Sequence, residues 1–104
     1  MALITLENAK EYLRVDTADE DALIAVLLAS SESLCADVAR LSEEQWNEIN
    51  SEDENTVLEP TRRIMRVAIF YALGYLFEHR EEADHHDLTL SLRSLLFSVR
   101  EGAV

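Results

Sequence analysis

The sequence predicts an all-α protein, a small bundle of about four to five helices. Two long antiparallel helices, over residues 20–41 and 60–80, are expected to be flanked by short ones. The chain of 104 residues has one proline and two glycines, so little in it interrupts a helix. Alanine, leucine, glutamate and arginine, which favour helices, dominate the composition. The length suits one compact helical domain over residues 1–104.

The first two helices are predicted from capping residues and from apolar spacing. Thr5 can cap a helix over residues 6–13, because its hydroxyl can accept a hydrogen bond from a free N–H of the first turn. Thr17 and Glu20 have capping-box spacing, so the next helix is expected to begin there. Apolar residues then recur at three- and four-residue steps to residue 41, which predicts an amphipathic core helix. Its middle carries a polar patch that indicates a close helix crossing or a solvated edge: Ser30, Ser31 and Ser33.

A short third helix follows. Ser42 and Gln45 have capping-box spacing, and Trp46 lies directly after them. A large aromatic side chain at this place is either a core residue or an anchor at an interface. Residues 50–58 are polar and acidic, and we expect a mobile loop there.

Pro60 suits the first position of the next helix, where its missing N–H costs nothing. Residues 64–77 carry one charge and are otherwise apolar or small on every side, so the helix should be buried all round. One small core cannot easily enclose it, and the run is shorter than the roughly 20 residues of a membrane span. Self-association is therefore expected, and the residues assigned to the subunit interface are Arg62, Arg66, Phe70, Tyr71 and Tyr75.

Three arginines lie in the first turns of this helix, at the end where the helix dipole disfavours cations: Arg62, Arg63 and Arg66. Acidic partners are expected, either in residues 43–59 or on a neighbouring subunit, with solvated arginines as the alternative.

A last helix is predicted over residues 88–99, with one apolar side made of Leu88, Leu92, Leu95, Leu96 and Val99. Residues 100–104 should fray. The preceding stretch has the only cluster with metal-ligand chemistry: His79, Glu82, Asp84, His85, His86 and Asp87. The paired-histidine spacing of metalloprotease helices is absent, so a solvated loop is expected, with no metal and no cofactor. The lone Cys35 is expected to be a small buried residue.

Charge and motifs exclude several classes of function. The net charge is -12, so the chain has no basic surface suited to gripping nucleic acid. An acidic surface would instead let DNA pass without sticking. No phosphate-binding loop, nucleophile elbow or cysteine-pair zinc spacing is present, and we do not expect an enzyme. No export signal is visible, which is typical of a cytoplasmic protein.

Three segments together resemble the tailed-bacteriophage head-tail connector family, whose members are also called head-completion or DNA-packaging adaptor proteins. They are the opening LENAKEYLRVDTADEDALIAVLLASSES, the apolar RVAIFYALGYLFEHRE and the closing LRSLLFSVRE. The resemblance covers nearly the whole chain. It depends on the order and spacing of helical patterns, because none of these segments is a catalytic signature.

The resemblance implies a structural subunit of a phage or prophage. It would form a ring of about a dozen copies beneath the portal and make part of the channel for DNA packaging and ejection. Its partners would be the portal protein, a tail-proximal head-completion or stopper protein, and double-stranded DNA that passes without tight binding. No membrane is involved. The location would be the virion at the head-tail junction, and the host cytoplasm during assembly.

The family also implies that the C-terminal part of the chain meets the portal. The candidates are Arg93, Phe97, Val99 and Arg100, with Leu95 and Leu96 beside them, although the leucines can equally close the subunit's own core. Residues 84–87 lack the proline or glycine that the family often has before its last helix, which leaves the angle of that helix open. The candidates for lining the channel are the densest acids: Glu43, Glu44, Glu48, Glu52, Asp53 and Glu54.

The alternative function is an acidic protein-interaction or regulatory module, such as a DNA mimic or an antitoxin-like protein, that binds a basic partner. The small size and the charge of the chain favour it.

Overall fold

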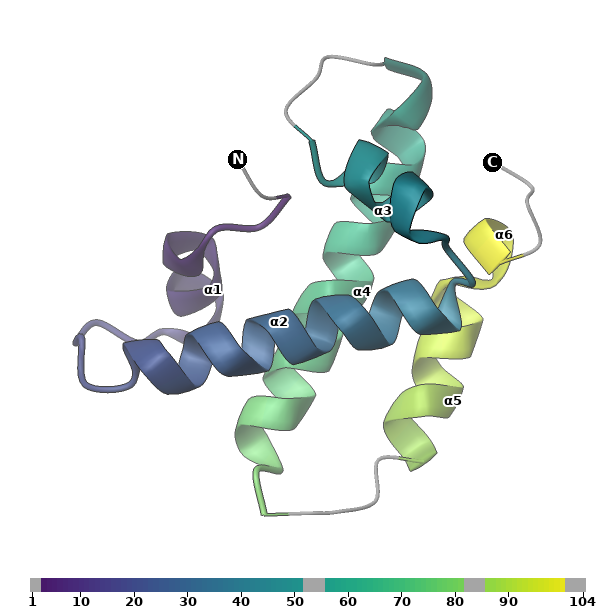
Figure 1. The fold of residues 1–104 in the computed structure, drawn as a ribbon. Helices are drawn as coiled ribbons and strands as arrows, with labels where there is room; N and C mark the ends of the chain where they lie inside the picture. Colours follow the sequence, from purple (N-terminus) through teal and green to yellow (C-terminus); the bar gives the residue numbers. More distant parts are fainter. Residues whose placement is uncertain (1–2, 52–55, 82–85, 101–104) are drawn as a thin grey trace.

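The computed structural model describes residues 3–51, 56–81 and 86–100, and this part of the chain contains helices and no strand. The prediction of an all-α protein is confirmed. The elements are α1 (Leu6–Leu13), α2 (Asp21–Val38), α3 (Glu43–Ile49), the 3-10 turn η1 (Thr56–Leu58), α4 (Glu59–Glu78), α5 (His86–Leu95) and α6 (Phe97–Arg100) (Figure 1).

The two long helices cross each other. Figure 1 shows α2 lying across α4, so the prediction that they run antiparallel side by side is wrong. Small side chains fully buried on both helices, Ser31 on α2 and Ala68 and Ala72 on α4, favour a close crossing of two backbones. The Ser31 hydroxyl donates to the Leu27 carbonyl at 2.7 Å, so it does not lie buried without a partner. Ser30 and Ser33 are exposed, and the polar patch therefore has both a buried and a solvated part.

One apolar cluster holds the helices together. Helices α1 and α5 flank α4 on opposite sides (Figure 1), and α2 covers it between them. The α5 residues Leu88 and Leu92 are fully buried, as is Leu96 after the helix ends. Leu95 is 39% exposed, so its predicted place on the core side is wrong. The large side chains that are fully buried are Ile4, Ile24, Met65, Ile69, Leu73, Leu88, Leu92 and Leu96.

The predicted cap at Thr5 and the predicted capping box at Ser42 are confirmed. The Thr5 hydroxyl accepts from the Asn8 N–H, and the Asn8 side chain accepts from the Thr5 N–H, both at 3.1 Å. Ser42 and Gln45 make the same reciprocal pair, at 3.1 and 2.9 Å. Each box satisfies two backbone donors and fixes where its helix begins.

The capping box predicted at Thr17 is wrong. Helix α2 begins at Asp21, and the residue before it, Glu20, makes no hydrogen bond from its side chain to the helix end. Ion pairs hold this end instead. Lys10 of α1 lies 2.7 Å from Asp21, and Arg80 lies 3.4 Å from Glu20.

Three boundaries differ from the predictions. Helix α2 ends at Val38 rather than 41, and Arg40 takes the left-handed conformation that often follows a helix end (φ 58°). Pro60 is the second residue of α4, not the first. The last helix is divided into α5 and α6. Of the predicted acidic loop, residues 52–55 lie outside the described residues, as do residues 101–104 of the predicted frayed tail.

Candidate protein-interaction surfaces

Arg62 joins α3 to α4 inside the subunit. Its side chain is 3% exposed, and its Nε and Nη2 atoms donate to the carbonyls of Ile49 and Glu48 at 3.0 and 3.1 Å. Its Nη1 atom lies 3.3 Å from a carboxylate oxygen of Glu59. The last carbonyls of a helix have no hydrogen-bond donor within the helix. Arg62 donates to the carbonyls of the last two residues of α3. The assignment of Arg62 to the subunit interface is therefore wrong, and its partners lie within residues 43–59.

The outer side of α4 is not buried within the subunit. Val67 is 59% and Tyr71 44% exposed, and together with exposed Arg63 they follow one another at four-residue steps along the helix. The expectation of burial on every side is thus not met by one subunit alone. We call the set of Tyr12, Arg63, Arg66, Val67 and Tyr71 the α4 face.

Tyr12 belongs to the α4 face although it lies on α1. Its ring stacks on Phe70, with centroids 4.8 Å apart, and about half of the side chain is exposed. A Cβ atom added to Gly74 would lie 3.3 Å from a ring carbon of Tyr12, so the glycine leaves room for this ring on α4. Half-buried Phe70 thus has an aromatic neighbour in its own chain. No pattern in the sequence pairs Tyr12 with α4, because the contact joins residues distant in the chain.

The two arginines of the α4 face have no ion-pair partner among the described residues. Neither Arg63 nor Arg66 makes an ion pair or a hydrogen bond with a side chain or carbonyl in the described part of the chain. Both lie in the N-terminal half of α4, where the helix dipole does not favour them. Arg66 also lines a hollow of about 400 Å³ between α1 and α4, next to Tyr12 and Phe70.

A second exposed face lies on α5 and α6. Its members line a hollow of about 650 Å³: Leu90, Arg93, Ser94, Phe97 and Arg100. Phe97 is 62% exposed, and Leu90 is also exposed. The Nε atom of Arg100 is buried and has no hydrogen-bond partner among the described residues. We call this set the α5–α6 face.

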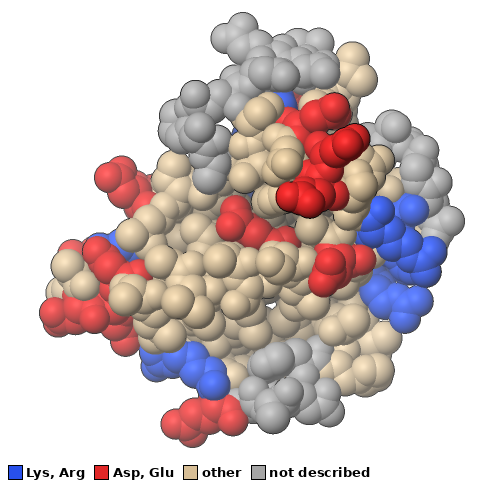
Figure 2. Space-filling view, in the orientation of Figure 1, with Lys and Arg blue, Asp and Glu red and all other residues tan. Residues whose placement is uncertain are grey.

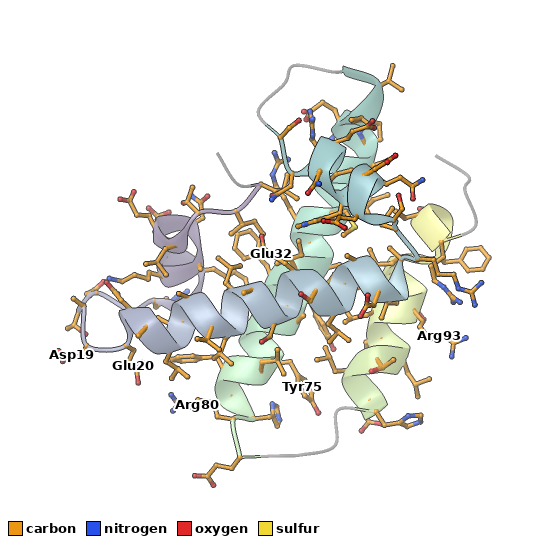
Figure 3. The ribbon with its side chains drawn as sticks, in the orientation of Figure 1. Asp19, Glu20, Glu32, Tyr75, Arg80 and Arg93 are labelled. Carbon is orange, nitrogen blue, oxygen red and sulfur yellow. The ribbon has the colours of Figure 1, made fainter. Side chains whose placement is uncertain are left out.

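The α5–α6 face is basic on an acidic protein. Figure 2 shows Lys and Arg atoms gathered where Figure 1 has α5 and α6, and Figure 3 shows Arg93 projecting from α5 at the edge of the bundle. Of the four portal-facing candidates, the structure places Arg93, Phe97 and Arg100 on this face. Val99 is buried in the core, so its assignment to an outer surface is wrong.

Exposed acids gather over α3, as Figure 2 shows. Glu43, Glu44 and Glu48 are all exposed on this helix. The other channel-lining candidates, Glu52, Asp53 and Glu54, lie outside the described residues.

A hollow of about 490 Å³ lies between the outer side of α2 and the start of α3, and we call it the α2–α3 hollow. Its apolar lining includes Ala29, Ala36, Leu41 and the half-buried Trp46, which also packs against the core. Its acidic lining is Glu32, Asp37 and Glu43. Burial raises the pKa of the Glu32 carboxyl, which Figure 3 labels on α2.

Cys35 is not a candidate nucleophile. Its side chain is fully buried, as predicted. Burial, and secondarily the charge of Glu32, raise the pKa of its thiol to about 12. The thiol therefore stays protonated at neutral pH, whereas a reactive cysteine needs a lowered pKa.

The region around His79 does not form a metal site in the described part of the chain. The His79 ring stacks on half-buried Tyr75, with centroids 4.1 Å apart, and its Nδ1 atom lies 2.8 Å from the Tyr75 carbonyl oxygen. No group of three potential metal ligands occurs among the described residues. The predicted cluster members Glu82, Asp84 and His85 lie outside them. Within the same ranges, no helix is both long and apolar enough to cross a membrane.

Comparisons with protein-family models, with curated proteins and with solved structures give no match to this chain.

Proposed function

We propose that this protein is a structural head-tail connector subunit of a phage or prophage, which assembles into a ring beneath the portal and forms part of the DNA channel. The observation that carries the proposal is that a subunit of 104 residues has two separate faces combining exposed apolar side chains with arginines. Exposed apolar patches of this kind mark sites of protein association. A connector subunit needs two such contacts, one to its neighbours in the ring and one to the layer above.

Each of the two faces would make one of these contacts. The α4 face would join copies of the chain, since Val67 and Tyr71 form an exposed apolar stripe along the helix. The α5–α6 face would meet the portal, through Phe97 as an aromatic anchor and Arg93 and Arg100 at its sides. Helices α1 and α5 flank α4 on opposite sides, so one contact leaves room for the other.

The charge of the molecule supports the passage of DNA. With a net charge of -12, a ring of these subunits would repel the phosphates of a duplex in its channel and so would not retain it. Exposed Glu44 and Glu48 on α3 are available for the channel wall. The subunit would have no catalytic role, and its location would be the head-tail junction of the virion.

A pair of variants tests the proposal. We expect light scattering to find a discrete large oligomer, formed either by the chain alone or after a purified candidate portal protein is added. Tyr71→Glu should give a helical monomer by circular dichroism, because it puts a charge in the contact between copies. Phe97→Glu should no longer bind the portal protein, and it should keep any self-association that the chain shows without the portal protein. A strict monomer under both conditions, or portal binding that Phe97→Glu leaves unchanged, would contradict the proposal.

The charge itself favours the second function, an acidic module that binds a basic protein. This function gives a different result in the same experiment. The chain would stay a monomer or dimer that ignores the portal, and it would form a tight 1:1 or 2:2 complex with a basic protein.

A further inference from the structure

We propose that the α4 face of one copy binds the α2–α3 hollow of a second copy. This inference rests on the proposed self-association of the chain and names the two surfaces that meet. It follows from the chemistry of the surfaces and from where the fold places them.

The two surfaces are complementary in charge and in shape. The α4 face is a ridge of exposed Val67 and Tyr71 beside Arg63 and Arg66, which lack partners among the described residues. The α2–α3 hollow is a concave surface lined by apolar side chains and by three acids: Glu32, Asp37 and Glu43. Apolar side chains of the ridge would enter the hollow, and the arginines would meet the acids at its rim.

Contact with such a partner would stabilise the side chains of the hollow more than contact with water does. Glu32 lies half-buried, and burial already raises the pKa of its carboxyl. The partly buried Trp46 and Leu41 beside it offer apolar area that a side chain such as Tyr71 would cover. If Glu43 pairs with an arginine of the next copy, it leaves the set of channel-lining candidates.

The fold places the two surfaces on opposite sides of the α2–α4 pair. Val67 and Tyr71 lie on the side of α4 away from its buried residues, among them Ala68 and Ala72. On α2, the exposed hollow residues Ser33 and Asp37 lie on the side away from the one that buries Ile24, Leu28, Ser31 and Cys35, and half-buried Glu32 lies between the two sides. A contact between different surfaces on opposite sides is heterologous, so it can repeat from copy to copy and close into a ring.

A charge exchange tests the pairing. Arg63→Glu should lower the association constant of the chain by about tenfold or more, because like charges would face each other. Asp37→Arg should do the same. The helix dipole favours both new charges, because the new acid lies near the start of α4 and the new base near the end of α2. Loss of association would therefore not reflect a weakened helix.

The double variant Arg63→Glu with Asp37→Arg should regain association, measured by light scattering over a concentration series at low salt. Arg14→Glu, a matched charge reversal at an exposed residue that lies after α1 and outside the surfaces named here, should leave association between copies unchanged. Single variants that associate like the wild type, a double variant that stays dissociated, or a wild type that is monomeric with and without the candidate portal protein would overturn the pairing. Restored association without portal binding would support the pairing and contradict the connector function.

Discussion

The inner and outer sides of α4 show how one helix can serve a core and a surface. Arg62 and Arg63 are neighbours in the sequence. Arg62 is buried and donates to the last carbonyls of α3, whereas Arg63 is exposed and has no partner among the described residues. Ile69 and Val67 differ in the same way, since Ile69 is fully buried and Val67 is mostly exposed. A helix that is apolar on both sides therefore stabilises the subunit with one side and offers the other to a partner.

The largest effect is expected from truncation on the inner side. Ile69→Ala should lower the free energy of unfolding by about 2–5 kcal/mol, because it removes buried methyl groups and leaves a cavity. Val67→Ala should change it by less than about 0.5 kcal/mol in the monomer. Chemical denaturation at low protein concentration measures both values. Equal costs for the two variants would mean that the sides of α4 do not differ in this way.

The arginine pair should show the next largest difference. Arg62→Met keeps most of the side-chain volume but removes the donor to the Ile49 carbonyl and one of the donors to the Glu48 carbonyl, which also accepts from Ser51, at a cost of about 1–3 kcal/mol. Arg63→Met should be within about 0.5 kcal/mol of the wild type. Hydrogen exchange would locate the damage, since the amides of α3 should lose protection in Arg62→Met. Unchanged protection of α3 would contradict the role given to Arg62.

The smallest effect is expected at Glu32 on α2. Its side chain is half-buried, so its exposure is intermediate between that of the inner and the outer side of α4. Burial raises the pKa of its carboxyl in the folded protein, so the folded state binds the proton more tightly than the unfolded chain does. Stability should therefore fall as the pH rises from the unfolded pKa of about 4.3 through the raised pKa, and the loss should persist at neutral pH. Glu32→Gln should recover it, by less than about 1 kcal/mol because solvent still reaches the side chain.

A matched control separates burial from total charge in that measurement. Glu44→Gln removes the same charge from the exposed surface of α3. The gain in melting temperature at neutral pH should be larger for Glu32→Gln, and it should vanish at acid pH where both carboxyls are protonated. An equal gain in the two variants would attribute the effect to net charge.

Much of the local structure could be predicted from the sequence. Thr5 was recognised as a cap from its hydroxyl directly before a helix, and Ser42 from the glutamine three positions after it, and a sequence displays both directly. The same pattern at Thr17 failed, since ion pairs to Lys10 and Arg80 hold the start of α2 and no local pattern encodes a partner 60 positions away. The division between α5 and α6 was also missed, because the apolar spacing continues across it.

The candidate surfaces could be predicted only in part. Arg93, Phe97 and Arg100 share a face because they are close in the sequence. Tyr12 and Phe70 belong together only because α1 packs on α4. The roles of Arg62 and Val99 were assigned wrongly, since the inner side of each helix is fixed by what packs against it.

The sequence by itself determined the helical class, most helix positions and the excess of negative charge, because propensities, caps and composition act over a few residues. Only the tertiary structure decided that α2 crosses α4 and which side of α4 has exposed apolar residues. It also decided which arginine is buried. These features depend on the packing of side chains that are distant in the chain, and the apolar pattern of α4, nearly uniform around the helix, does not distinguish its inner side from its outer one.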